Sequence, residues 1–203
     1  MQIQSKEGLA AMTPEKALAL LKEGNQRFVN GRKLEHKLMQ QLVETSKGQF
    51  PFAVVLSCVD SRVPPELIFD QGIGDIFSIR IAGNLVNTDI LGSMELACKV
   101  VGSKHILVLG HTRCGAIRGA FDDVELGNLT GLIKKLKPAF RAVQGSSELK
   151  SGASLDQISE MNVRLNIEKI KQQSPVLKEM MDNKEISISG AMYDVESGKV
   201  SFL

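Results

Sequence analysis

Three short apolar runs constrain the fold of this chain more than any other feature of its sequence. They cover residues 52–57, 76–81 and 105–109, are rich in β-branched residues, and are bounded by Gly, Pro or polar turn residues. Because their apolarity is continuous rather than alternating, we expect strands buried on both faces, as in a parallel sheet. A helical pattern over residues 90–101 lies between the second and third runs, and this order predicts an α/β fold with a central, mainly parallel sheet flanked by helices.

The segments on either side of these runs predict further helices. One helix begins at Thr13-Pro14, a capping residue followed by proline, and ends at Asn30-Gly31, with Asn25 as the polar exception on its apolar face. Helices are also predicted over residues 35–47, 115–121, 129–143 and 155–173, with a polar loop over residues 144–152.

The C-terminal end of the chain predicts a hairpin. Residues 185–195 and 200–203 flank a Glu-Ser-Gly-Lys turn and are expected to add antiparallel edge strands. Because the sequence shows no repeat or linker, we predict a single domain over residues 1–203, with a helical arm (1–47) and an α/β core (48–203).

Composition excludes several classes of partner. The chain is 43% apolar and 24% charged, its formal net charge is only +2, and it has no Trp, so neither disorder nor a nucleic-acid partner is expected. No apolar run reaches the roughly 18 residues that a membrane span needs, and the first residues lack the pattern of a secretory signal. We therefore predict a cytoplasmic protein without a membrane partner, in which three cysteines are a poor disulfide framework.

Two clusters of reactive side chains each follow a predicted strand. Cys58 lies in Ser-Cys-Val-Asp-Ser-Arg after the first run, and His111 and Cys114 lie in Gly-His-Thr-Arg-Cys-Gly after the third. Ligands in open α/β sheets bind outside the carboxyl ends of the strands, so these clusters can meet in space. Two thiolates and one imidazole suit Zn(II), and three protein ligands leave a position for water, as in catalytic zinc sites.

Asp60 and Arg62 lie beside the first of these clusters. Alternate residues of an extended segment point the same way, so the two side chains can form a bidentate ion pair. Such a pair would keep the Asp60 carboxylate ionised and aimed at the metal site.

Together the two motifs resemble the β-class carbonic anhydrases. C-x-D-S-R is followed by G-H-x-x-C-G, with Cys58 and His111 separated by 53 positions, and the similarity extends over residues 13–195. It includes the stretches Asn-Gln-Arg-Phe at 25–28, Val-Pro-Pro-Glu at 63–66, Gly-Asp-Ile-Phe at 74–77 with Arg80, and Ala-Gly-Asn at 82–84.

This resemblance implies zinc-dependent, reversible hydration of CO2 to bicarbonate and a proton by zinc-bound hydroxide. It implies Cys58, His111 and Cys114 as zinc ligands and Asp60 with Arg62 as the catalytic dyad. The resemblance further implies three residues that contact substrate: Gln49, which binds bicarbonate from across a dimer interface, Phe77 in the CO2 pocket, and Gly115, where bulk beside the metal is excluded. It also implies assembly as a homodimer or homotetramer, with the helical arm reaching across. Leu96 departs from the family, which often has an aromatic residue there.

Three alternative functions remain open at this stage. The chain could be a hydrolase with Cys114 or Cys58 as a nucleophile activated by His111. It could be a non-enzymatic zinc module or redox sensor, with Asp60 as a permanent fourth ligand. It could also act on carbon disulfide or carbonyl sulfide at the same zinc site, as some relatives in the resembled family do. The remaining histidines and the third cysteine have structural interpretations: His36 on a solvated helix, His105 at the start of a strand, and Cys98 in helix packing.

Overall fold

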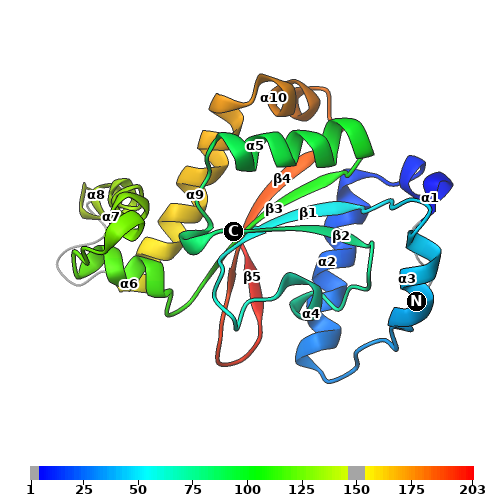
Figure 1. Cartoon of the computed structure of the whole chain (residues 1–203), viewed down its shortest axis with the longest axis horizontal. Coiled ribbons are helices and arrows are strands. Elements are labelled where there is room, and N and C mark those ends of the chain that lie inside the picture. Colours follow the sequence, from blue (N-terminus) through cyan, green and yellow to red (C-terminus); the bar gives the residue numbers. More distant parts are fainter. Residues whose placement is uncertain (1–4, 146–153) are drawn as a thin grey trace.

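A computed structural model describes residues 5–145 and 154–203 of the chain. Its centre is a five-stranded sheet in the order β2-β1-β3-β4-β5 (Figure 1). The strands β1 to β4 are parallel, and β5 pairs with β4 in antiparallel orientation. Their bounds are β1 (Ala53–Ser57), β2 (Ile76–Arg80), β3 (His105–His111), β4 (Ser187–Tyr193) and β5 (Val200–Phe202).

Helices surround the sheet and connect its strands. The α-helices, in chain order, are α1 (Lys6–Ala10), α2 (Pro14–Val29), α3 (Leu38–Thr45), α4 (Pro65–Ile68), α5 (Thr88–Glu95), α6 (Gly115–Phe121), α7 (Gly127–Lys134), α8 (Lys137–Gly145), α9 (Leu155–Gln173) and α10 (Pro175–Asp182). A 3-10 turn, η1 (Ala82–Asn84), precedes α5, and a π-helical turn, η2 (Leu96–Val101), follows it.

The structure confirms the α/β fold, the three predicted strands and the C-terminal hairpin, with three corrections. The third strand runs two residues further than expected, so His111 ends β3 rather than following it. Within the hairpin only β5 is at the edge, because β4 follows a helical crossover and pairs in parallel with β3. Finally, β2 is not buried on both faces: it is an edge strand, and Ser78 and Arg80 are exposed.

The predicted helices are confirmed over 14–29, 115–121 and 155–173, and three others differ in extent. The segment 129–143 forms two helices, α7 and α8, because Pro138 lacks an amide hydrogen and cannot continue a helix. The helix predicted over 35–47 is the shorter α3, and that over 90–101 ends in the π-helical turn. The short helices α1, α4 and α10 were not predicted, and the loop predicted over 144–152 lies outside the described residues from 146 onward.

Both faces of the sheet are covered by helices (Figure 1). On one face, Val55, Leu107 and Leu109 pack with Ala17 and Leu21 of α2. On the other face, the alternate side chains of the strands pack against α5, α9 and α10. The strands contribute Val54, Leu56, Ile106 and Val108, and the helices contribute Met94, Val163 and Leu177. A third cluster joins α6, α7 and α8 to the carboxyl ends of β1 and β3, and it includes Cys58 and Cys114.

The buried amide of Asn25 explains the polar exception in α2. Its Nδ2 donates to the carbonyl oxygens of Ile68 at 3.2 Å and Gly198 at 2.9 Å, and its Oδ1 accepts from the Val200 amide at 2.9 Å. Residues of α2 therefore pack on the sheet of their own chain. The division into an arm over residues 1–47 and a core over 48–203 stays a prediction.

The order of the strands places one end of β1 beside one end of β3. The chain passes from β1 to β2 on one side and then returns to β3 on the other side of β1. At such a reversal the connections leave the carboxyl ends of neighbouring strands in opposite directions, which opens a crevice where ligands bind. Cys58 follows β1 and His111 ends β3, so both lie at this crevice. Among residues 5–145 and 154–203, no helix is both long and apolar enough to cross a membrane.

Candidate metal centre

The structure brings Cys58, His111 and Cys114 together. One ligand atom from each residue lies within 4.8 Å of the others, and all three side chains are buried. All three cysteines of the chain are free thiols, so Cys58 and Cys114 are available as donors. The convergence predicted from the two motifs is therefore confirmed as geometry.

Each of these side chains is positioned by a different local feature. Cys58 follows β1 directly, and its sulfur accepts a hydrogen bond from the Gly83 amide at 3.4 Å. Gly83 has a φ of 68°, and a Cβ there would lie 3.1 Å from Leu136, so glycine suits both the conformation and the packing. His111 ends β3, whereas Cys114 is the N-cap residue of α6.

The hydrogen bonds of His111 leave one ring nitrogen for a ligand. Its Nδ1 lies 2.9 Å from the Thr112 carbonyl oxygen, which can only accept, so Nδ1 carries the hydrogen. Its Nε2 is buried and has no partner among the described residues. A buried nitrogen with a free lone pair is costly unless a ligand such as a metal ion satisfies it.

The two thiols also suit a cation. The hydrogen bond from Cys114 lowers the pKa of Cys58, although burial opposes it. The pKa of Cys114 is raised in turn by its hydrogen bond to Cys58 and by burial. The pair therefore favours one thiolate and one thiol, and binding of a divalent ion would displace the remaining proton. Two sulfurs and an imidazole nitrogen form a donor set that fits Zn(II).

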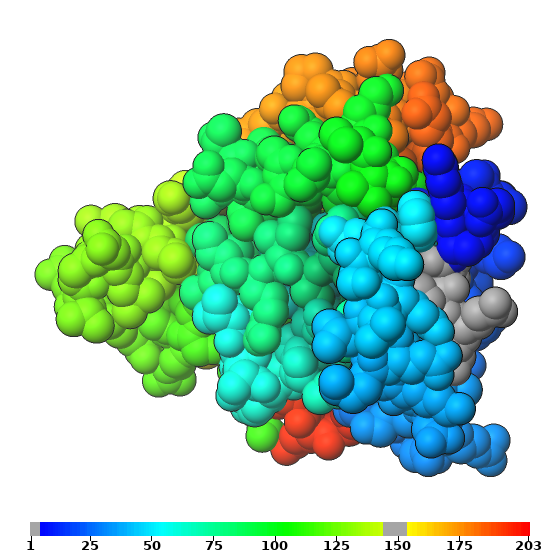
Figure 2. All heavy atoms as spheres, turned by 45° about the vertical axis from the view of Figure 1, so that its right-hand side comes forward, coloured from blue at the N-terminus to red at the C-terminus, as the bar shows by residue number. Residues whose placement is uncertain are grey.

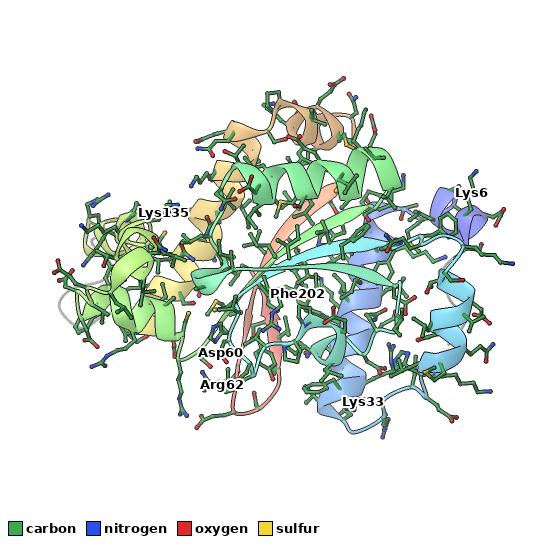
Figure 3. All side chains as sticks on the ribbon, in the orientation of Figure 1. Lys6, Lys33, Asp60, Arg62, Lys135 and Phe202 are labelled. Carbon is green, nitrogen blue, oxygen red and sulfur yellow. The ribbon has the colours of Figure 1, made fainter. Side chains whose placement is uncertain are left out.

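Asp60 and Arg62 form the bidentate pair that the sequence predicts. Arg62 Nε donates to Asp60 Oδ1 at 2.9 Å, and Nη2 donates to Oδ2 at 2.8 Å; the two side chains lie together below the sheet in Figure 3. The hydrogen bonds from Arg62 lower the pKa of Asp60 to about 2. At neutral pH, Asp60 is therefore ionised.

Arg80 supports this loop, although the sequence assigned it no role. Its Nε donates to the Cys58 carbonyl at 3.0 Å, and its Nη2 donates to the Asp60 carbonyl at 2.6 Å. Arg80 ends β2, so it anchors the loop after β1 to the neighbouring strand. The signal in the sequence was a cation at the end of the next predicted strand, 20 positions after Asp60, since parallel strands bring such ends together.

The three predicted substrate-binding residues lie apart from one another. Gly115 begins α6 directly after Cys114, and an added Cβ would meet no atom of the described chain within 4 Å. Gln49 precedes β1, and Phe77 is the second residue of β2, so both lie towards the amino ends of the strands, away from Cys58. Within one chain, Gln49 and Phe77 do not join the cluster. Their roles, like that of Gly115, stay predictions.

The structure corrects one of the structural interpretations and confirms two. His36 precedes α3 and is half-buried, with Nε2 3.0 Å from Asp70 Oδ1, so its placement on a solvated helix is wrong. His105 begins β3 and contacts the hydroxyls of Ser187 and Ser189. Cys98 is packed in η2, and burial raises the pKa of its thiol to about 12, which makes it inert.

The fold and the site together define the class of protein. It is an α/β protein with a candidate metal centre, formed by two thiols and an imidazole at the point where the strand order reverses. A family model described as "Carbonic anhydrase" matches residues 53–200. The chain is 33% identical to "Carbonic anhydrase 2" of Mycobacterium tuberculosis over 194 residues, which cover 92% of this chain and 91% of that protein. The chain belongs to the β-carbonic anhydrases, a family of enzymes.

Solved structures of β-carbonic anhydrases share this fold. The β-carbonic anhydrase CcaA is similar with a TM-score of 0.73 and 28% identity, covering 91% of this chain and 94% of that one. One of two tetrameric β-carbonic anhydrases from Sordaria macrospora has a TM-score of 0.71 and 27% identity, covering 80% of this chain and 85% of that one.

Proposed function

We propose that this chain catalyses the reversible hydration of CO2 to bicarbonate and a proton at a zinc ion held by Cys58, His111 and Cys114. The observation that carries the proposal is the buried ligand cluster, with its three donor atoms within 4.8 Å and the His111 Nε2 lone pair unused. Family membership supports the reaction, and the donor set supports the metal.

Zinc held by these residues would act as a Lewis acid that makes water a nucleophile near neutral pH. The protein contributes the orientation of that water. Asp60, kept ionised by Arg62, accepts a hydrogen bond from the reacting water and turns its lone pair towards the carbon of CO2. Arg62 meanwhile occupies both carboxylate oxygens, which holds Asp60 back from the metal.

A second copy of the chain completes the site. Gln49 and Phe77 lie at the amino ends of β1 and β2, so they reach a cluster at the carboxyl ends only from a neighbouring subunit. There Gln49 binds bicarbonate and Phe77 lines the CO2 pocket, while Gly115 leaves room beside the metal. The chain accordingly assembles as a homodimer or homotetramer, in line with the tetrameric relatives from Sordaria macrospora.

An exposed apolar face supports this assembly. It comprises Leu38, Met39, Leu42 and Val43 of α3 with Leu96 and Val100 of η2, of which Met39 is 75% and Val100 74% exposed. Figure 2 shows α3 and the η2 segment on one side of the molecule. Two exposed apolar patches on one side of the molecule are unusual in monomeric proteins, and a second copy would cover them.

The decisive experiment combines metal analysis with a stopped-flow assay of CO2 hydration on purified protein. We expect one zinc per chain, loss of activity on chelation and recovery with zinc. Parallel assays with carbon disulfide and carbonyl sulfide test the alternative substrates, and alkylation kinetics with and without chelator test a cysteine nucleophile. Metal-free protein that is inert towards CO2 would overturn the proposal.

A further inference from the structure

The first turn of α9 holds the loop that carries two of the proposed ligands. Asp156 Oδ1 accepts a hydrogen bond from the Arg113 backbone amide at 2.8 Å. One turn further, the buried Ser159 hydroxyl donates to the His111 carbonyl at 3.1 Å. Asp156 lies 43 positions from Arg113 in sequence, so this contact exists only in the folded chain.

Arg113 is the residue whose conformation sets the geometry of this loop. It lies between His111 and Cys114 and has a φ of 54°, a left-handed conformation that side chains other than Gly, Asn and Asp rarely adopt. Backbone of this kind persists only when neighbouring contacts hold it. The Asp156 carboxylate is such a contact, because it binds the amide of the strained residue directly.

The same residue also touches the proposed dyad. The Arg113 carbonyl oxygen accepts a hydrogen bond from Arg62 Nη2 at 3.3 Å, and that nitrogen also binds Asp60. A change in the Arg113 peptide would therefore move the ligands on either side of it and the arginine that aims Asp60.

We infer that Asp156 is a positioning residue for this site, acting through the Arg113 peptide on both the ligand loop and the Asp60–Arg62 pair. The inference rests on the proposed function. Asp156 binds a backbone amide rather than a ligand side chain in this hydrogen bond, so its effect is transmitted by the backbone, much as residues around a metal site orient its ligands.

A purely structural role for Asp156 is the competing explanation. Carboxylates in the first turn of a helix are favourable because of the helix dipole. However, Ser154 and Gln157 already form a capping box at the start of α9. The helix thus has its own cap, and a structural role for Asp156 predicts a loss of stability without a change at the metal.

The test compares Asp156→Ala with Asp156→Asn, whose side-chain oxygen can still accept the amide hydrogen. Glu160→Gln is the matched control, since Glu160 lies one turn along α9 and pairs only with Arg164 in the described structure. Each variant is measured for zinc affinity, for the visible absorption spectrum of the cobalt(II)-substituted protein, and for kcat and KM of CO2 hydration.

We expect Asp156→Ala to lose about 10- to 100-fold in zinc affinity or kcat, the usual range for groups behind metal ligands, and to shift the cobalt spectrum. Asp156→Asn should recover most of this loss, and Glu160→Gln should match the wild type. In an Arg113→Gly background, where the left-handed conformation is unstrained, Asp156→Ala should lower zinc affinity or kcat by less than about 3-fold.

A wild-type cobalt spectrum and kcat in Asp156→Ala would overturn the inference, whatever the change in melting temperature. The inference would also be overturned if Asp156→Ala lowered zinc affinity or kcat equally whether Arg113 is present or replaced by glycine. Failure of the proposed function is distinguishable: the wild-type protein would then be inactive towards CO2, while the cobalt spectrum and zinc affinity would still report on Asp156.

Discussion

Arg62 holds Asp60 by two side-chain hydrogen bonds and a third from its own backbone amide, at 2.9, 2.8 and 3.0 Å. The guanidinium occupies both carboxylate oxygens and fixes the direction of the group. A planar, bidentate contact of this kind is specific to arginine, because the ammonium group of lysine offers no matching fork.

We predict that Asp60→Asn binds zinc normally but loses at least about 100-fold in kcat, since a neutral amide accepts a hydrogen bond from the reacting water more weakly than a carboxylate and can present its NH2 group instead. Arg62→Lys should also lose activity, with zinc content unchanged. Metal analysis and stopped-flow hydration check both variants. Full activity of Asp60→Asn would refute the role proposed for this carboxylate.

Replacement of any proposed ligand should abolish zinc binding and turnover together. Cys58→Ser, His111→Ala and Cys114→Ser each leave only two strong donors, too few to retain the metal during dialysis. Cys98→Ala is the control, because this buried thiol lies in a separate core cluster. Zinc content equal to wild type in Cys114→Ser would show that the ligand set is wrong.

The buried amide of Asn25 should be essential for stability. Asn25→Leu is similar in size but leaves the carbonyls of Ile68 and Gly198 and the amide of Val200 unpaired. Since an unsatisfied buried polar group costs about 1–3 kcal/mol, we expect a loss of at least about 3 kcal/mol in the free energy of unfolding.

Urea unfolding at fixed protein concentration measures the effect of Asn25→Leu. Glu23→Ala, an exposed position in the same helix, should stay within about 0.5 kcal/mol of wild type. Equal stability of the two variants would contradict the importance of these three hydrogen bonds.

His105 should make the folded chain sensitive to acid. Burial, aided by the charge of Lys22, lowers the pKa of His105 from 6.5 to about 4. The folded state therefore favours the neutral ring, and its stability is lost as pH falls from 6.5 towards 4. Between pH 7.5 and 5.0 this histidine alone should cost about 2 kcal/mol.

The variant His105→Gln isolates the contribution of His105 to the pH dependence of stability. Glutamine can still bond to the serine hydroxyls but does not titrate, so its stability should fall less than that of the wild type over the same pH range. Other acid-sensitive groups, including the metal ligands, are common to both proteins and cancel in the comparison. Parallel pH profiles from urea unfolding would argue against His105 as the origin.

The apolar face should control assembly. Val43→Asp places a charge on α3, where the wild-type side chain is 69% exposed, and should shift the protein towards monomers in light scattering. Activity should fall with assembly if Gln49 acts on a neighbouring subunit. Leu126→Asp is the matched control, an apolar residue 67% exposed outside this face. An unchanged mass for Val43→Asp would contradict the proposed interface.

Much of the site was predictable because its reactive side chains lie in short, continuous sequence motifs. Cys58 and His111 stand at the ends of apolar runs, and parallel strands bring their carboxyl ends to the same edge of a sheet. The pairing of Asp60 with Arg62 was also predicted, but for a different conformation: the prediction assumed an extended segment, whereas the pair forms in a turn in which the Val63 amide donates to the Asp60 carbonyl at 3.0 Å.

Other features depended on neighbours that local patterns do not specify. His36 appeared to belong to a solvated helix, yet it lies against the buried carboxylate of Asp70, 34 positions away. The strand β4 looked like an edge strand, but a helical crossover inserts it beside β3. In both cases the deciding contact is distant in sequence.

The sequence by itself therefore determined the strands, the helices over 14–29, 115–121 and 155–173, and the identity of the donor atoms, because backbone propensity and side-chain chemistry act over a few residues. Only the tertiary structure decided why Asn25 is polar inside an apolar face and why Asp156 matters to Arg113. Their partners lie 43 to 175 positions away, and loop closure at that range is settled by packing of the whole sheet.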